Sequence, residues 1–297
     1  MPTIELRNLT KFYGKSRGIQ DVSFDVFPSE VFGFLGPNGA GKTTTIRTLM
    51  GLIHATSGTA TILGMNALDS RHELRQQIGY LPGVFATYSN YTAKEFLSFV
   101  ARMRRVDCSE TITDYAERLK LDLTRHIHDL SKGNRQKVGV IYAFMHKPRV
   151  LFLDEPTSGL DPLVQREFET ILNEAQARGA SIILSSHVLS EVENLADRIA
   201  IINEGKIIVV EHISTLKDRA VRSIDLYFET TINAHKFAEI HGLREVFVDG
   251  ERVRCTVTGS EHELLKRAVE YGVVTVHTHE PSLEEIFHEL VQIGKPQ

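Results

Sequence analysis

The 297-residue chain is 42% hydrophobic and 24% charged, an ordinary globular composition that excludes disordered and collagen-like proteins. Its length suffices for one large or two modest domains. Because 34 basic and 38 acidic residues leave a net charge of −4 at pH 7, the chain lacks the overall positive charge that draws proteins onto nucleic acid or anionic lipid. No nucleic-acid partner is therefore expected.

The cysteine content and the hydropathy pattern both favour a cytosolic location. Two cysteines, Cys108 and Cys255, are too few for a disulfide framework, so a reducing compartment is expected. The N-terminus lacks the apolar core of a signal peptide, and no stretch approaches ~20 apolar residues without charges. The sequence therefore predicts no membrane span of its own.

From residue 2 to residue 209 the hydrophobic pattern predicts strands alternating with helices. The first strand begins near Ile4, and the expected later elements are strands over 31–35, 150–153 and 181–184 with a helix over 43–51. The later strands are short, apolar and rich in branched residues, which is typical of a buried parallel sheet. Helical spacing in segments between 92 and 144 indicates a helical subdomain, about 84–146, inserted into an α/β fold.

After about residue 216 the pattern changes to that of a small α+β domain over 216–297. Strands are expected over 223–228, 244–248, 252–257 and 273–277, and helices over 233–240, 261–271 and 282–291. Asp249-Gly250 is a strong hairpin turn between the second and third strands. The order strand, helix, strand, strand, helix, strand is that of a ferredoxin-like unit.

The clearest chemical motif follows the strand over 31–35. Residues 36–43 read GPNGAGKT and fit the phosphate-binding pattern G-x-x-x-x-G-K-[ST], placed between a strand and a helix as the mechanism requires. Backbone N–H groups of such a loop point at phosphates, while Lys42 reaches the β- and γ-phosphates and the Thr43 hydroxyl reaches Mg²⁺. The candidate nucleotide-binding residues are Gly36, Asn38, Gly39, Ala40, Gly41, Lys42, Thr43 and Thr44.

Two carboxylates, Asp154 and Glu155, end the apolar run over 150–153. Ligand crevices in open α/β sheets lie at the carboxyl ends of strands. Asp154 is expected to hold Mg²⁺ and Glu155 to polarise an attacking water. Acidic residues also commonly end strands as solvated caps, so this pair gains its weight from the phosphate loop. A hydrolase acting on ATP needs both features.

Four further segments complete a recognisable set. They are Leu130-Ser131-Lys132-Gly133-Asn134, Ser158-Gly159-Leu160-Asp161, His187, and Tyr13 within Lys11-Phe12-Tyr13-Gly14. With these motifs, the region from Ile4 to Glu211 resembles the ATP-binding cassette of ABC transporters. The four correspond to that family's signature motif, D-loop, switch histidine and adenine-stacking aromatic. The resemblance implies a P-loop NTPase core over 1–215.

The resemblance also implies how the residues act. The expected enzyme is an ATPase that uses ATP and Mg²⁺, with Lys42, Glu155 and His187 as catalytic residues. Two chains would form a head-to-tail homodimer in which Ser131 and Gly133 of one chain contact the ATP of the other. Transport would need separate membrane permease subunits, which would hold the protein at the inner face of the cell membrane.

Simpler interpretations of individual residues stay open. Ser131 alone reads as an N-cap of a helix, His187 as a polar surface residue, and Tyr13 as a packing residue. His277 and His279 share one face of a strand, and His126 and His128 are also two apart, but neither pair has an evident third metal ligand. These histidines are therefore not expected to bind a metal.

The chain departs from the family pattern at three positions. Gly83 stands where the family usually has Gln after the segment Ile78-Gly79-Tyr80-Leu81-Pro82, so a direct contact from that side chain to Mg²⁺ or water is not expected. Lys132 and Asn134 replace two residues of the signature motif. With the C-terminal segment 281–287, these departures resemble ATPase subunits of bacterial ABC-2 type exporters. The alternative is a soluble ABC ATPase that remodels ribosomes or DNA ends. Proteins of that class usually have two cassettes or long coiled-coil insertions.

Overall fold

The computed structural model describes residues 1–69, 72–85, 90–219, 222–233, 237, 240, 242–257, 261–279, 283, 284 and 286. The chain divides into two compact units, Met1–Val210 and Glu211–Gln297. Each unit has its own hydrophobic core, so each is described separately.

The first unit begins with an antiparallel sheet in the order β2-β1-β4-β5. Its strands are β1 (Ile4–Tyr13), β2 (Ser16–Val26), β4 (Ser57–Ile62) and β5 (Met65–Asn66). The expected alternation of strands and helices is wrong here, because β1, β2 and β3 follow one another before the first helix. A tight turn at Gly14, with φ of 59°, lets β2 fold back on β1. Leu6 and Val22 then bury the same face.

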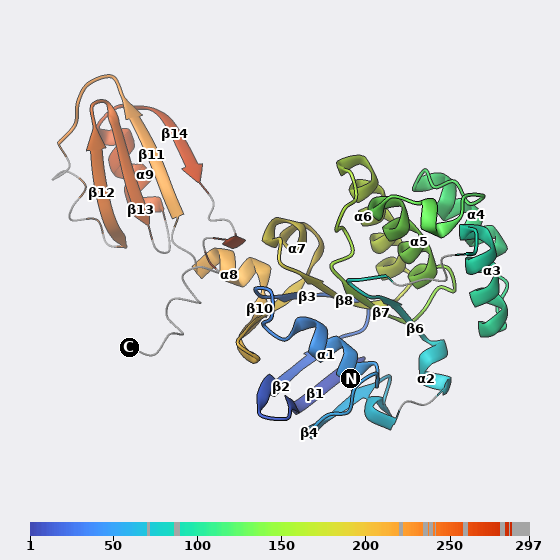
Figure 1. Ribbon diagram of the computed structural model, residues 1–297. Helices are drawn as coiled ribbons and strands as arrows, with labels where there is room; N and C mark the ends of the chain where they lie inside the picture. The colour runs from blue at the N-terminus through green and yellow to red at the C-terminus, as the bar shows by residue number, and fades with distance from the viewer. Residues whose placement is uncertain are drawn as a thin grey trace. The chain divides into compact units, whose positions relative to one another are not determined.

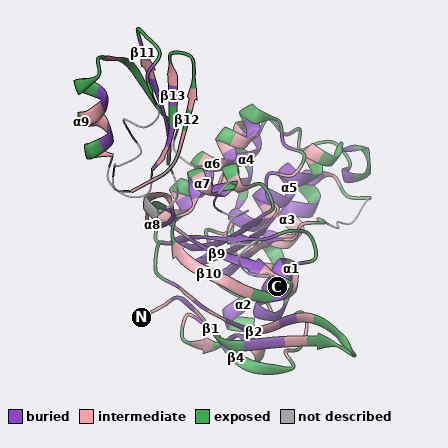
Figure 2. Cartoon of the chain, turned by 90° about the vertical axis from the view of Figure 1, so that its left-hand side faces the viewer, coloured by how far each residue is buried: buried purple, intermediate pink, exposed green. Residues whose placement is uncertain are grey.

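The central sheet has six strands in the order β10-β9-β3-β8-β7-β6. They are β3 (Val31–Leu35), β6 (Ile78–Leu81), β7 (Val150–Asp154), β8 (Ser181–Ser186), β9 (Arg198–Asn203) and β10 (Lys206–His212). β3 pairs in parallel with β8 and β9, and β7 with β6 and β8. Every residue of β3, β7 and β8 is buried, which confirms the predicted buried parallel core (Figure 2).

Helix α1 (Lys42–Leu49) lies between the two sheets (Figure 1). Its apolar residues Ile46 and Leu49 join a core that includes Leu6 of β1, Phe34 of β3 and Phe152 of β7. Helices α5 (Lys132–Phe144), α6 (Pro162–Ala177) and α7 (Leu189–Leu195) lie on the other side of the central sheet. The start of α1 is thereby fixed at the carboxyl end of β3.

The segment between β6 and β7 is helical, as its spacing predicts. It contains α3 (Ala93–Arg104), α4 (Ser109–Arg118), the 3₁₀ turn η2 (Ile127–Asp129) and α5, while η1 (Ala67–Asp69) and α2 (His72–Gln76) precede β6. Thr92 and Glu95 form a reciprocal capping box at the start of α3. Arg118 joins α4 to α6 through Glu167 at 2.6 Å and Glu174 at 2.8 Å.

Among the described helices, none has the length and apolarity needed to cross a bilayer.

The second unit holds an antiparallel sheet in the order β12-β13-β11-β14. Its elements are α8 (Ile213–Arg219), β11 (Arg222–Phe228), β12 (Leu243–Asp249), β13 (Arg252–Val257), α9 (His262–Glu270) and β14 (Val273–His279). The helices predicted over 233–240 and 282–291 fall largely outside the described residues. The ferredoxin-like assignment therefore stays a prediction.

Candidate active site

A cavity of about 370 Å³ opens at the carboxyl ends of β3, β7 and β8. Because these strands are parallel neighbours, their carboxyl ends meet at one edge of the sheet and bring distant segments together. Nine of the residues predicted from the sequence line it: Asn38, Gly39, Gly41, Lys42, Thr43, Thr44, Asp154, Glu155 and His187. Pro37, Gly83 and Ser158 complete the lining.

The phosphate loop occupies the turn between β3 and α1. Gly39 and Gly41 have φ of 80° and 114°, values that favour glycine over any residue with a side chain. A Cβ on Gly41 would lie 2.6 Å from Cγ2 of Ile19. Gly41 is also the N-cap of α1, and no side chain caps the helix there. The N–H groups of the first turn are thus left to face an anion.

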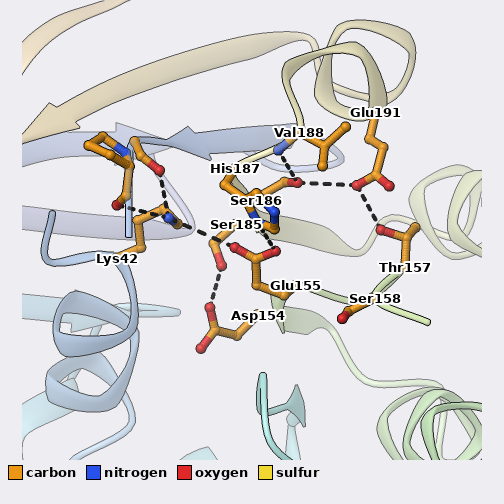
Figure 3. A network of polar contacts seen from close by, with 12 residues as sticks. Lys42, Asp154, Glu155, Thr157, Ser158, Ser185, Ser186, His187, Val188 and Glu191 are labelled. Atoms are coloured by element: carbon orange, nitrogen blue, oxygen red, sulfur yellow. Dashed lines mark hydrogen bonds and ion pairs between the residues drawn. The ribbon is translucent and has the colours of Figure 1, made fainter. Parts of the chain in front are cut away.

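Lys42 extends back along this loop. Its ammonium donates to the Gly36 carbonyl oxygen at 2.6 Å and lies 3.8 Å from Oε1 of Glu155 (Figure 3). Burial lowers the pKa of Lys42, while the nearby charges of Glu155 and Asp154 oppose that shift. A buried cation beside a cluster of backbone N–H groups is suited to hold a phosphate.

Asp154 is held by two hydroxyl groups from different elements. Oδ2 accepts from the Thr43 hydroxyl at 2.7 Å, and Oδ1 accepts from the Ser185 hydroxyl at 2.5 Å. The Asp154 side chain is almost fully buried. A hydroxyl and a carboxylate that already meet at the cavity form the oxygen donor set that Mg²⁺ prefers. Sequence reasoning missed Ser185, although Ser185 directly opposes Asp154 in the parallel register of β7 and β8.

Glu155 stands between Lys42 and His187. Its Oε2 lies 2.5 Å from Nδ1 of His187, while its Oε1 faces the Lys42 ammonium (Figure 3). Glu155 has φ of 53°, in the left-handed region, and its N–H donates to the Ser185 carbonyl at 3.0 Å. Such a conformation costs on the order of 1–3 kcal/mol and is retained where the surrounding structure imposes it. The turn aims a carboxylate into the cavity, where that group can accept a proton from water.

Two members of the phosphate loop and Tyr13 lie outside the cavity lining. Gly36 contributes the carbonyl that Lys42 contacts. Ala40 is buried, and its carbonyl accepts from the Gly205 N–H at 2.8 Å. Tyr13 is 50% exposed. A Cβ built on Gly18 would meet the Tyr13 ring at 3.0 Å and Cγ2 of Thr44 at 3.2 Å. The ring therefore lies near the start of α1, and the Lys11 ammonium lies 5.2 Å from its centroid.

Ser131 and Gly133 lie at the start of α5, apart from the cavity lining. The Ser131 hydroxyl caps the helix by accepting from the Asn134 N–H at 3.2 Å. A Cβ on Gly133 would lie 2.5 Å from the Gly159 carbonyl oxygen. Lys132 donates to the Ser158 hydroxyl at 3.2 Å. The start of α5 thus packs on the segment over 158–159, which reaches the cavity through Ser158.

Gly83 lines the cavity beside Asp154 and brings no side chain to it. A Cβ on Gly83 would lie 3.4 Å from Oδ2 of Asp154, in ordinary contact. Gly83 is not among the residues of positive φ, so the backbone here does not require glycine. The effect of glycine at this position is therefore the absence of a side chain next to the carboxylate.

The histidine pairs have other partners. The His277 ring packs on Tyr227 with centroids 5.5 Å apart, and Nε2 of His279 lies 3.1 Å from Oδ2 of the buried Asp225. His126 and His128 stack on each other. Within the described part of the chain, no group of three or more His, Cys, Asp or Glu side chains is arranged to hold a metal ion.

Comparison with known proteins extends these observations. The sequence pattern of a family described as ABC transporter matches residues 19–158. The bacitracin transport ATP-binding protein BcrA of Bacillus licheniformis is 34% identical over 300 residues, covering 98% of this chain and 98% of that protein. The linearmycin resistance ATP-binding protein LnrL of Bacillus subtilis (strain 168) is 31% identical over 305 residues, covering 97% of each. A solved structure of an ATP-binding subunit of an ABC transporter is 30% identical with a TM-score of 0.69, covering 72% of this chain and 92% of that chain.

Proposed function

The chain belongs to the ABC transporter family as an ATP-binding and ATP-hydrolysing subunit, and from this premise we propose that it drives export of a substrate through separate membrane permease subunits. The proposal rests on the observation that one cavity is lined by Lys42, Thr43, Asp154, Glu155 and His187. A phosphate-binding loop and a carboxylate positioned to activate water are the two parts that ATP hydrolysis needs.

Each residue of the cavity has a proposed role in hydrolysis. Lys42 and the N–H groups at the start of α1 bind the β- and γ-phosphates. Glu155 orients the attacking water and accepts its proton. His187 holds the Glu155 carboxylate at 2.5 Å and contacts the γ-phosphate. Tyr13 stacks on the adenine ring beside the loop.

Thr43 and Asp154 are the proposed ligands of Mg²⁺. Their oxygen atoms meet at 2.7 Å at the edge of the cavity, and both are hard donors of the kind this ion selects. When bound, Mg²⁺ neutralises part of the phosphate charge. Ser185 would keep the Asp154 carboxylate in place through its contact with the other oxygen.

The active form is proposed to be a head-to-tail homodimer. Ser131 and Gly133 do not line the cavity of their own chain, but they lie at a helix start that can approach the γ-phosphate in a second copy. A γ-phosphate held by two chains stabilises the closed dimer, whereas ADP offers no such contact. Nucleotide state would then control the interface.

Export is supported by the relatives, two of which are named for bacitracin transport and linearmycin resistance. Residues 1–215 are proposed as the ATPase domain, with the helical insert near Gly83 as the face that meets the permease. Residues 216–297 form the proposed accessory domain. The protein would thereby lie at the inner face of the cell membrane.

The homodimer can be tested on a sizing column with the Glu155→Gln variant, which is expected to bind ATP and hydrolyse it slowly. With ATP and Mg²⁺ the variant should elute as a dimer, and with ADP as a monomer. The matched control is the same variant carrying Ser131→Arg, which should not dimerise. A monomer with ATP at concentrations that saturate the site would count against the proposed dimer.

A further inference from the structure

The carboxylate of Glu191 lies outside the cavity lining. It connects the segment that carries Glu155 with the segment that carries His187, the two proposed catalytic residues. Oε2 of Glu191, in the first turn of α7, accepts from the Thr157 hydroxyl at 2.7 Å and from the Ser186 hydroxyl at 3.1 Å (Figure 3). Thr157 and Ser186 are both almost fully buried, with 6% and 1% exposure. A single oxygen thus satisfies two buried donors that would otherwise lose hydrogen bonds.

These contacts close a ring around the proposed catalytic groups. Thr157 follows Glu155 by two residues, and Ser186 immediately precedes His187. The ring closes where His187 meets Glu155 at 2.5 Å. The backbone already joins the two segments where β7 pairs with β8, through the Glu155 N–H and the Ser185 carbonyl at 3.0 Å. Beyond that pairing, side chains join them at two further points, once through Glu155 and His187 and once through Glu191.

The same ring has a connection to the start of α5. The residue after Thr157 is Ser158, which accepts from Lys132 at 3.2 Å. Gly159 presents the carbonyl that packs against Gly133. A shift of the segment over 157–159 would consequently move both the Thr157 hydroxyl and the surface that holds α5.

We propose that Glu191 is a positioning residue for ATP hydrolysis, which acts by joining Thr157 to Ser186 and so holds His187 and Glu155 in register. Glu191 touches neither of these two groups in the contacts described above, so its influence passes through the two hydroxyls. The property required at residue 191 is an acceptor oxygen at that point, and a negative charge is not required. The inference rests on the proposed roles of Glu155 and His187.

The test compares steady-state hydrolysis of ATP by the full chain and its variants. Glu191→Ala should lower kcat about tenfold or more and leave KM for ATP within about twofold, because the phosphate loop is unchanged. Glu191→Gln keeps an acceptor oxygen and should restore kcat to within about threefold of the parent. Asn194→Ala, an exposed change on the same helix, is the matched control and should match the parent.

Two further variants separate positioning from a general loss of folding. Thr157→Val removes one donor and should lower kcat by several-fold, while Thr157→Ser should retain it. The double variant Thr157→Val with Glu191→Ala should be no slower than Glu191→Ala alone, since both changes break the same connection. Thermal unfolding of each variant shows whether it is folded, and if Glu191→Ala does not fold, the Thr157 pair decides the matter.

Three results would overturn the inference: an unchanged kcat in Glu191→Ala or Thr157→Val, a Gln variant as slow as the Ala variant, or a loss that appears in KM rather than kcat. The parent chain is measured in the same assay. If the parent does not hydrolyse ATP, the proposed function itself fails, whereas an active parent with an unaffected Glu191→Ala variant rejects only the positioning role.

Discussion

The Thr43 hydroxyl donates to Oδ2 of Asp154 at 2.7 Å, which joins the start of α1 to the end of β7. β7 is a buried central strand and α1 is packed between two sheets. The backbone positions of Thr43 and Asp154 are therefore fixed relative to each other. The proposed Mg²⁺ ligands are thus brought together by the packing of the core.

Thr43→Ala should weaken binding of ATP in the presence of Mg²⁺ about tenfold or more and have little effect when EDTA removes the metal. The reason is that the change deletes a proposed metal ligand and leaves the N–H groups of the phosphate loop intact. Calorimetric titration with and without Mg²⁺ measures both affinities. Thr43→Ser, which keeps the hydroxyl, is the control, and an equal loss under both conditions would speak against the assignment.

Lys42→Ala should weaken nucleotide binding itself, by about tenfold or more, because it removes the cation that is proposed to bind the phosphates. The loss should be larger for ATP than for AMP, which has no β- or γ-phosphate. Lys15→Ala, at an exposed residue of the turn between β1 and β2, serves as the control in the same titration. Unchanged ATP affinity in Lys42→Ala would remove Lys42 from the site.

Gly83→Gln should give little gain in basal hydrolysis. Thr43 and Asp154 already provide oxygen donors, and a side chain at residue 83 would begin 3.4 Å from the Asp154 carboxylate. Gly83→Ala should stay within about threefold of the parent, since its Cβ fits at ordinary contact distance. Phosphate release measures both, and a large basal increase in the Gln variant would show that the missing amide limits catalysis.

His146 should make the first unit less stable as the pH falls. Burial, with a smaller effect of the Arg104 charge, lowers the pKa of His146 from the ordinary 6.5 to about 4. Between these pH values the unfolded chain binds a proton that the folded chain does not, so the free energy of unfolding decreases by about 1–3 kcal/mol on acidification. Urea unfolding at pH 7 and pH 4.5 measures the loss, which His146→Gln should reduce. An identical pH dependence in that variant would exclude His146 as the source.

The parts of the site that follow short-range rules could be predicted from the sequence. The phosphate loop and the end of β7 are contiguous motifs, and the helix predicted over 43–51 is observed as Lys42–Leu49. The β1–β2 hairpin was not predicted, because its apolar alternation is interrupted by irregular register between the strands. A period-based reading assumes a regular strand.

The contacts of Ser185 and Glu191 with distant segments could not be predicted. Ser185 and Glu191 are ordinary polar residues in the sequence, and their roles appear only when β8 lies beside β7 and α7 follows. Such partners depend on strand order, which local patterns do not specify. The positions of Ser131 and Gly133 relative to a second chain likewise require the assembly.

The central claim is that Glu155 activates the attacking water during ATP hydrolysis, in a site where Lys42 binds the phosphates. The most direct test measures ATP binding and steady-state phosphate release for the parent and for Glu155→Gln. The account predicts that the parent hydrolyses ATP with Mg²⁺, and that Glu155→Gln binds ATP as tightly as the parent while its turnover falls about 100-fold. Near-normal phosphate release by Glu155→Gln would contradict it.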